Sequence, residues 1–368
     1  MNISAVQLYV IKMPLKSPFQ THLGTVIERE GIIVEVTDID GVSGYGEGVA
    51  FSTPWYTEET VKTSLHMLTD ILIPLLKKNA VSHPEEAAVL FKSVKRNHMA
   101  KAGLEMALWD LYSKKHAKSL ASVIGGTRET IASGVVVATD STVIALNQIE
   151  KFLSEGYQRF KVKINPKQDY AFLEEIRRHF PDLPLMADAN SAYTLKDLER
   201  LKKLDDFNLL MIEQPLAADD IIEHSKLQKS IRTPICLDES IVTFEDAKQA
   251  IELGSCRVIN IKSGRVGGLY EAKKIHDYCL EKGVPVWCGG MIEFGISRAH
   301  NIALASLPGF TIPGDISASS RFWEEDIISP EVTVNDGYVK VPTTPGIGFS
   351  INQKRLKDVQ LMKSLFKF

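Results

Sequence analysis

Five charged side chains recur at an almost constant interval in the middle of the chain. They are Lys163, Asp188, Glu213, Asp238 and Lys262, separated by 25, 25, 25 and 24 positions, and each closes a short apolar run such as RFKVKI or LLMIE. This interval accommodates one strand and one helix, so we expect the five groups at the C-terminal ends of successive parallel strands. In a closed (β/α)8 barrel, catalysis takes place at this face.

The three acids at this spacing predict a metal site. Asp188, Glu213 and Asp238 would converge because neighbouring strands lie only about 5 Å apart. Carboxylates this close repel one another unless a cation lies among them. Oxygen-only ligands that leave room for water and substrate favour Mg²⁺ over zinc, with Mn²⁺ as a substitute. For one acid alone, capping of the following helix is the alternative, but three acids in register favour metal binding.

The two lysines flank the acids in sequence, one strand before them and one strand after. In a barrel, Lys163 and Lys262 would therefore face each other across the metal. Lys161 points to the same side of its strand as Lys163, and a second ammonium beside a cation disfavours protonation of Lys163, which suits a general base. The alternative is that the lysines reach solvent or form structural salt bridges with the acids. The set favours removal of a proton next to a carboxylate, with the metal neutralising the enolate charge that develops.

The surrounding segments predict a (β/α)8-type TIM barrel with an α+β capping domain. Residues 1 to about 50 alternate like antiparallel strands, and TEETVKTSLHMLTDILIPLLKK and MAKAGLEMALWDLYSKKHAKSL have helical periodicity. From about residue 130, apolar runs alternate with amphipathic stretches, which predicts βα units. We count eight strand runs, the last near GFTIPGD, and interpret KSGRVGG as a barrel loop. We assign residues 1–125 to the capping domain, 126–322 to the barrel and 323–368 to a segment that returns to the cap.

Composition excludes several classes of function. The net charge of -3 and pI of about 6.3 give no basic field for nucleic acid or an acidic membrane. No run of 18 apolar residues and no signal peptide is found, so we expect no membrane association. The four cysteines lack a CxxC pairing, which indicates a reduced, cytoplasmic protein.

These residues resemble the enolase superfamily, and within it the muconate lactonising enzyme subgroup. That subgroup has a Lys-x-Lys on the second barrel strand and a facing lysine on the sixth, which match Lys161-Val162-Lys163 and Lys262. Its metal ligands fall on Asp188, Glu213 and Asp238. The stretches MPLKSPFQTHLGT, IEQPL, VPVWCGGMIEFGISRAHNIALASLPGF and PGDISASSRF are similar to the o-succinylbenzoate synthase / N-succinylamino acid racemase group.

The resemblance implies a Mg²⁺-dependent enzyme that acts on a small carboxylate and forms a homo-oligomer. The first implied activity dehydrates a cyclohexadiene carboxylate to o-succinylbenzoate in menaquinone biosynthesis. In that reaction Lys163 would abstract the α-proton and help hydroxide leave, while Lys262 steadies the enolate. The alternative is N-succinylamino acid racemase, in which both lysines act on opposite faces of the same enolate.

Two further alternatives are weighed on residues. Dipeptide epimerases of the subgroup carry Asp-x-Asp at the eighth strand, whereas this chain has Asp315-Ile316-Ser317 and lacks the second acid. A barrel that has lost catalysis should lack one of the five charged residues, and none is missing.

The remaining expectations concern contacts with substrate. Besides Lys161, the residues that the sequence or the resemblance assigns to substrate binding or support are Asn190, Gly290, Met291, Phe19, Phe51 and Phe322. For Asn190, a strand-ending turn is the alternative. For Gly289, Gly290 and Met291, small side chains would let substrate approach backbone N–H groups, or would simply form a tight turn. A phenylalanine is more often part of a core.

Overall fold

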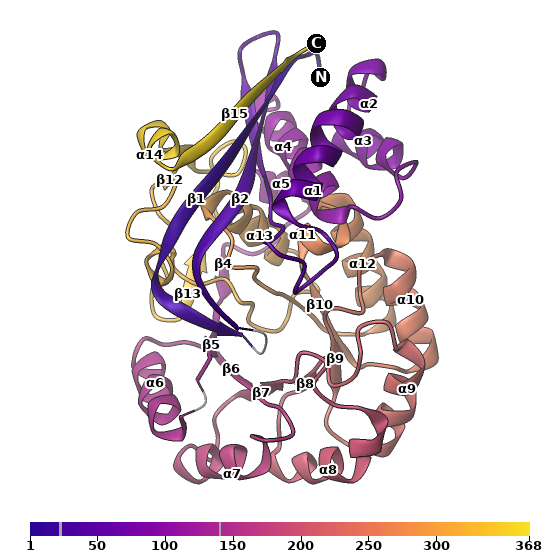
Figure 1. Cartoon of the computed structure of the whole chain (residues 1–368), viewed down its shortest axis with the longest axis vertical. Helices are drawn as coiled ribbons and strands as arrows, with labels where there is room; N and C mark the ends of the chain where they lie inside the picture. The colour runs from indigo at the N-terminus through magenta and orange to yellow at the C-terminus, as the bar shows by residue number, and fades with distance from the viewer. Residues whose placement is uncertain (22–23, 140) are drawn as a thin grey trace.

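The two largest sheets of the chain divide it into an upper and a lower layer (Figure 1). The computed structural model describes residues 1–21, 24–139 and 141–368. A four-stranded antiparallel sheet has the order β15-β1-β2-β3, and a seven-stranded parallel sheet has the order β11-β10-β9-β8-β7-β6-β5. The parallel order follows the sequence without a crossover, as in a barrel whose helices lie outside. The predicted α/β barrel with an added cap is thereby confirmed.

The antiparallel sheet joins the two ends of the chain. Its strands are β1 (Ile3–Thr21), β2 (Gly24–Asp38), β3 (Ser43–Gly48) and β15 (Gln360–Lys367). Val6 lies opposite Val36 on one side and Phe366 on the other. Alternate residues of β1, such as Val6 and Leu8, are fully buried against the helices of the cap, because successive side chains of a strand point to opposite faces.

Most of the cap helices fall in the two stretches with helical periodicity. The helices are α1 (Val61–His66), the π-helical η1 (Met67–Leu72), α2 (Ile73–Lys78), α3 (Pro84–Phe91), α4 (His98–Lys115) and α5 (Leu120–Ile124). Of these, α3 lies between the two stretches and α5 extends beyond the second. The first begins later than the sequence suggests, because Thr60 caps it by accepting from the Thr63 amide. The second stretch does not run on to Leu120, since Ala117 has a φ of 49° that no right-handed helix allows.

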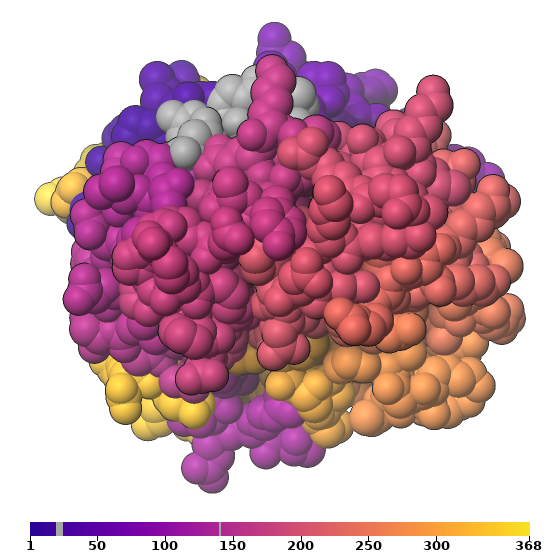
Figure 2. Space-filling model, turned by 90° about the horizontal axis from the view of Figure 1, so that it is seen from below, coloured from indigo at the N-terminus to yellow at the C-terminus, as the bar shows by residue number. Residues whose placement is uncertain are grey.

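The barrel strands are short and end where the charged residues stand. They are β5 (Gly134–Val137), β6 (Arg159–Lys163), β7 (Leu185–Asp188), β8 (Ile212–Glu213), β9 (Ile235–Leu237), β10 (Val258–Ile261) and β11 (Val286–Cys288). The helices between and after them are α6 (Thr142–Ser154), α7 (Tyr170–His179), η2 (Leu195–Asp197), α8 (Leu198–Lys203), η3 (Leu204–Phe207), α9 (Ile221–Ser230), α10 (Phe244–Leu253), α11 (Ser263–Val266), α12 (Leu269–Lys282) and α13 (Gly295–Ala305). Figure 2 shows the face below the barrel, formed largely by these segments in magenta to orange.

Two details of the predicted barrel are wrong. The eighth run, near GFTIPGD, is not a strand: Phe310 and Gly314 make only isolated bridges, to Val286 and Ser133, and so close the ring. Pro313 between them has no backbone N–H, so a continuous ladder cannot form. The segment KSGRVGG is not a loop throughout either, since its centre forms the short helix α11 and Lys262 is its N-cap.

The alternation of side chains along the strands determines which residues point into the barrel. Met186, Met211 and Cys236 point inward with Val258 and Trp287 and form a small apolar core. Two positions further along β7, β8 and just after β9, on the same face, come Asp188, Glu213 and Asp238. The period of two therefore places the three acids directly above an apolar floor.

The remaining elements connect barrel and cap. They are β4 (Thr130–Ala132), η4 (Ser319–Arg321), β12 (Ile328–Ser329), β13 (Tyr338–Lys340), β14 (Ser350–Ile351) and α14 (Gln353–Asp358). β13 pairs with β4 and β12 with β14. All four cysteines are buried and unpaired. Among residues 1–21, 24–139 and 141–368, no helix has both the length and the apolar character needed to cross a membrane.

Candidate active site

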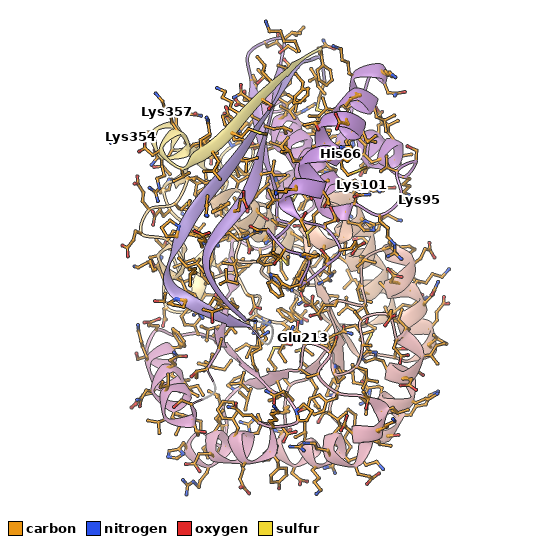
Figure 3. All side chains as sticks on the ribbon, viewed as in Figure 1. His66, Lys95, Lys101, Glu213, Lys354 and Lys357 are labelled. Atoms are coloured by element: carbon orange, nitrogen blue, oxygen red, sulfur yellow. The ribbon has the colours of Figure 1, made fainter. Side chains whose placement is uncertain are left out.

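A cavity with a free volume of about 100 Å³ lies at the C-terminal ends of the barrel strands, beneath the cap. Glu213, at the end of β8, lies in the barrel below the cap strands (Figure 3). The predicted residues that line the cavity are Phe19, Phe51, Lys161, Lys163, Asp188, Asn190, Asp238, Lys262, Gly290, Met291 and Phe322. The structure therefore brings the predicted site residues into one place. Glu213 lies just behind the wall, bonded to Lys161.

Lys163 is the lysine that faces the cavity. It pairs in register with Asp188 across β6 and β7, and its Nζ lies 2.7 Å from Asp188 Oδ2 and 2.5 Å from Asn190 Oδ1. Its side chain is 29% exposed, against 8% for Lys262. Asn190 also donates through Nδ2 to Glu239 Oε1, at 2.9 Å. Its φ of 40° shows that it both ends the strand in a turn and holds the ammonium of Lys163.

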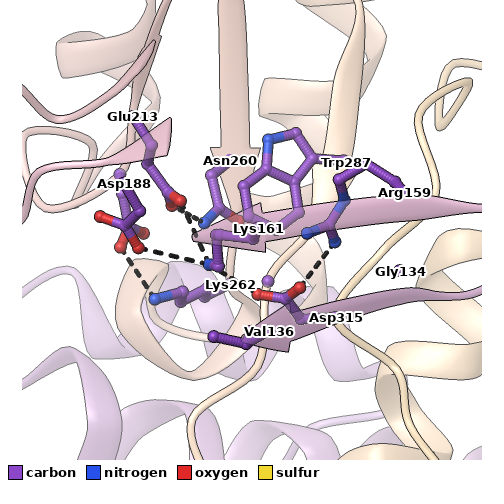
Figure 4. A network of polar contacts seen from close by, with 12 residues as sticks. Gly134, Val136, Arg159, Lys161, Asp188, Glu213, Asn260, Lys262, Trp287 and Asp315 are labelled. Carbon is purple, nitrogen blue, oxygen red and sulfur yellow. Dashed lines mark hydrogen bonds and ion pairs between the residues drawn. The ribbon is translucent and has the colours of Figure 1, made fainter. Parts of the chain in front are cut away.

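Lys161 is buried one pleat deeper, between three carboxylates (Figure 4). Its Nζ lies 2.7 Å from Asp315 Oδ2, 3.1 Å from Glu213 Oε2 and 3.5 Å from Asp188 Oδ2. Burial alone would lower the pKa of Lys161, but the three carboxylates raise it well above its ordinary value. The ammonium also lies 4.9 Å from the centre of the Trp287 ring. Lys161 is therefore held as a permanent cation that balances the acids around it.

Lys262 lies on the other side of the cavity and is more tightly held. Its Nζ donates to Asp238 Oδ2 at 2.8 Å and to the Tyr56 hydroxyl at 2.9 Å. Arg265 forms a second ion pair with Asp238 through Oδ1. Burial opposes the charge of Lys262, but Asp238 outweighs it and the pKa is raised.

The three acids have the donor chemistry that a hard divalent cation requires. Burial raises the pKa of Glu213, and the negative charge of Asp188 raises it further; an added cation would relieve this repulsion. In the described part of the chain, no three acidic, imidazole or thiol groups are arranged as a finished ligand set. The oxygens are turned instead to Lys161, Lys163, Lys262, Arg265 and Asn260. The side chains thus fit Mg²⁺ by the type of donor atom, and their oxygens would have to turn away from these partners to meet an ion.

Of Gly289, Gly290 and Met291, the first leaves room for neighbouring side chains and the other two line the cavity. A Cβ at Gly289 would lie 2.6 Å from Cε of Lys262, so only glycine leaves room for the lysine. Gly290 and Met291 line the cavity, but the Met291 amide donates to Glu293 Oε2 at 2.5 Å. That amide is therefore already occupied and does not point freely at a ligand.

Several polar residues of the site were missed by sequence reasoning. Tyr56 comes from a loop of the cap and has no periodic signal. Arg265 stands three residues after Lys262, a spacing that would have been informative had the short helix been predicted. Arg159 is two residues before Lys161 on the same face of β6, and its Nη2 donates to Asp315 Oδ1 at 2.6 Å. Strand alternation alone could have identified Arg159.

Glu239 was also missed, because it follows Asp238 directly and looks like a solvent-facing neighbour. Burial raises the pKa of Glu239 to about 7, and the charges of Asp238 and Asp188 act in the same direction.

Comparison with known proteins gives consistent results over the whole chain. The family model described as "Enolase C-terminal domain-like" matches residues 145–355, and that of the mandelate racemase / muconate lactonizing enzyme N-terminal domain matches residues 5–125. An o-succinylbenzoate synthase of Geobacillus stearothermophilus is 56% identical over 99% of this chain and 98% of its own. An N-succinylamino acid racemase of Thermus thermophilus is 42% identical over 98% of each chain.

A solved structure from Listeria innocua, described as a member of the enolase superfamily, superposes on the chain with a TM-score of 0.97. It is 43% identical and the match covers 100% of this chain and 99% of that one. A muconate lactonizing enzyme from Pseudomonas fluorescens, at 22% identity and a TM-score of 0.92, shares the fold. The resemblance drawn from the sequence is confirmed: the chain belongs to the mandelate racemase / muconate lactonizing enzyme family of the enolase superfamily, and it is an enzyme.

Proposed function

We propose that the chain dehydrates a cyclohexadiene carboxylate to o-succinylbenzoate in a Mg²⁺-dependent reaction. The observation that carries the proposal is the cavity-facing ammonium of Lys163 beside Asp188, with Lys262 held at Asp238 in the same cavity. Three o-succinylbenzoate synthases at 54 to 56% identity, each covered over 98% of its length, support the substrate.

The residues proposed to hold Mg²⁺ are Asp188, Glu213 and Asp238. When bound, the ion supplies positive charge that lowers the cost of forming an enolate from a carboxylate substrate. Binding requires the carboxylate oxygens to be released by Lys163, Lys262 and Arg265, which now donate to Asp188 and Asp238. Without Asp188 as its partner, and beside the charges of Lys161 and of the ion, the Lys163 ammonium would lose a proton to solvent more readily, and the neutral amine could then accept the α-proton.

The proposed division of labour follows the different surroundings of the two lysines. Lys163, with its more exposed side chain, removes the α-proton and then, as an ammonium, donates that proton to the departing hydroxide. Lys262, which Tyr56 still contacts once Asp238 turns to the metal, remains charged on the other side and stabilises the negative charge of the enolate. Dehydration needs one mobile base and one fixed cation, and this asymmetry supports it.

The test is direct. The protein is incubated with Mg²⁺ and the cyclohexadiene carboxylate, and the loss of the diene absorbance is followed, with a parallel sample in excess chelator. We expect turnover that stops without the metal. Absence of turnover at saturating Mg²⁺ would refute the assignment.

Racemisation of N-succinylamino acids is the second candidate, because lysines lie on two sides of one cavity and a racemase is 42% identical. It would require Lys262 to leave Asp238 and exchange protons as Lys163 does. Decay of the optical rotation of an N-succinylamino acid would establish it. A dipeptide epimerase is less well supported, because Asp315 is already paired with Arg159 and Lys161 and so cannot hold a substrate ammonium.

A further inference from the structure

One guanidinium in the wall of the cavity forms no ion pair with any acid among residues 1–21, 24–139 and 141–368. Arg321 ends η4, after the segment that closes the barrel. It borders both the reaction cavity and an outer groove of about 580 Å³. The two spaces also share Phe19, Val136 and Phe322, so Arg321 lies in the wall between them.

The hydrogen bonds of Arg321 are largely unused. Its Nη2 donates to the Val136 carbonyl at 2.6 Å, and its guanidinium lies 5.1 Å and 5.8 Å from the ring centres of Phe152 and Phe322. Within the described ranges, no carboxylate comes within 4.0 Å of it, whereas a guanidinium offers five donors. Glu155, which borders the outer groove, pairs with Lys151 instead.

The other arginines near the cavity each lie within 4.0 Å of a carboxylate, unlike Arg321 among the described residues. Arg159 pairs with Asp315, Arg265 with Asp238, and Arg298 lies 3.9 Å from Asp326. A largely desolvated cation without a counter-ion is unfavourable. An anionic ligand would supply both the missing charge and the missing acceptors.

The position of Arg321 defines what such an anion must be attached to. The reacting centre lies among Lys163, Lys262 and the three acids, and Phe19 and Phe322, whose rings meet edge to face at 6.3 Å, line the space beside Arg321. A ligand that reaches from one to the other needs a carboxylate at the reacting centre, a short apolar link and a second anion. A carboxylate that also carries a succinyl group has this form, because the two methylenes of the succinyl chain end in a second carboxylate.

We propose that Arg321 forms a second anion subsite, which binds the terminal carboxylate of the succinyl chain of the substrate. The subsite rests on the proposed function for the identity of the chain it binds. It makes Arg321 a specificity residue rather than a catalytic one, because its guanidinium meets the end of the substrate that does not react. The same contact would serve the dehydration and the racemisation, since both substrates carry the succinyl group.

The first test measures binding without turnover. Calorimetry with Mg²⁺ compares o-succinylbenzoate with its ester methylated on the succinyl carboxylate. We expect the wild-type protein to prefer the free acid by roughly 10- to 100-fold, the range for a charge-assisted hydrogen bond. Arg321→Met should bring the two affinities within about threefold of each other, and Arg321→Lys should restore part of the preference.

A matched control is Lys151→Met, which removes a cation from the border of the outer groove that pairs with Glu155. It should keep the wild-type preference, which separates a specific contact from general attraction. If the wild-type protein binds the acid and the ester equally, the subsite is refuted, even if Arg321→Met fails to fold. Equal loss of preference in Lys151→Met would refute the specific role too.

The second test uses turnover. The ratio of kcat/KM for an N-succinylamino acid to that for the N-acetyl form should fall about 10-fold or more in Arg321→Met, mainly through KM. A loss in kcat alone, equal for both substrates, would contradict the subsite. If the wild-type protein turns over neither class of substrate, the proposed function fails, while the binding comparison still decides the subsite.

Discussion

Buried carboxylates occur in two regions of this molecule, and they are neutralised in two different ways. At the barrel mouth, Asp188, Asp238 and Asp315 pair with lysine and arginine side chains. These partners lower the pKa of each acid, against the effect of burial. At the mouth, side-chain cations therefore favour the ionised form of Asp188, Asp238 and Asp315, whereas burial raises the pKa of Glu213 and Glu239.

The second region is the cap and its junction with the barrel. Glu47, Glu59 and Glu105 are buried there, and in the described part of the chain none of them has a cationic partner within ion-pair distance. Each accepts two backbone N–H groups at the start of a helix: Glu47 from α13, Glu59 from α4 and Glu105 from α12. Helix starts favour negative charge, but burial dominates and raises the pKa of all three acids.

The contrast distinguishes acids placed for a reaction, at the mouth, from acids that hold the fold together, at the junction. Acids that meet side-chain cations can exchange partners during a reaction. Acids that accept from backbone amides at a helix start are fixed, because the amides cannot move without unwinding the helix. Glu105 and Glu59 also accept from the neutral donors Trp109 Nε1 and Ser64 Oγ. Glu47 and Glu105 thereby connect the cap to α13 and α12 of the barrel. The side chains of the mouth take no part in these connections.

The largest expected effect is at the mouth. Lys163→Ala should lower dehydration by about 10³-fold, because it removes the proposed base, with little change in stability since Lys161 still faces Asp188. Turnover is measured from the diene absorbance and stability by chemical denaturation. Lys167→Ala, an exposed lysine on the following loop, is the control. An active Lys163→Ala enzyme would refute the assignment of the base.

The opposite pattern is expected at the junction. Glu105→Ala leaves the buried amides of Leu269 and Tyr270 without an acceptor, and should cost about 2–4 kcal/mol of unfolding free energy. The kcat of the protein that remains folded should stay within about twofold, since Glu105 lies outside the cavity. Urea unfolding and turnover at 25 °C check both. A large fall in kcat without a loss of stability would show that Glu105 serves catalysis, and would contradict the distinction between the mouth and the junction.

The pH dependence of stability sharpens the same contrast. Burial raises the pKa of Glu105 to about 7 from an ordinary value of 4.5, so the folded protein holds this proton more firmly than the unfolded chain. Its contribution to stability is therefore complete below about pH 4.5 and is lost as the pH rises to about 7. Relative to wild type, Glu105→Gln should gain about 3 kcal/mol across this window.

Parallel denaturation curves at pH 5 and pH 8 measure the Glu105→Gln difference. A difference between the two proteins that does not change with pH would show that Glu105 is ionised at all these pH values in the folded state.

A smaller effect is expected for the proposed metal. Asp238→Asn should weaken Mg²⁺ binding more than about tenfold, the lower bound seen for residues one shell further out. Calorimetry measures the affinity, and the exposed Asp219→Asn is the control. Unchanged affinity would remove Asp238 from the proposed ligands and leave it as a partner of Lys262 and Arg265.

The sequence predicts the mouth better than the junction, for a physical reason. Strand alternation and a constant βα interval are local rules, and they locate Lys163, Asp188 and Glu213 without any knowledge of the fold. Glu105 lies in a helix where almost every residue is buried, so its own helix gives no polar face by which to judge it. Its backbone partners, Leu269 and Tyr270, follow it by 164 and 165 positions.

Tyr56 could not be predicted from the sequence for a second reason. It lies in a loop with no regular structure, and its hydroxyl contacts Lys262 and Asp238, which follow it in the sequence by 206 and 182 positions. The eighth strand is wrongly predicted for a third reason, since the pattern of GFTIPGD is apolar enough but Pro313 removes the hydrogen bond that a ladder needs. Local patterns thus predict elements and their faces, whereas contacts that the cap makes with the barrel depend on the finished fold.

The pairing of β1 with β15 has a consequence for how the molecule is made. Ala5 lies opposite Lys367, so the cap sheet joins segments separated by the whole barrel. During synthesis β1 and β2 emerge first, and β15, the last strand of their sheet, is translated only after the whole barrel. We therefore expect the barrel to assemble first and the cap to be completed late, with the edge of β1 exposed to unwanted pairing in the interval.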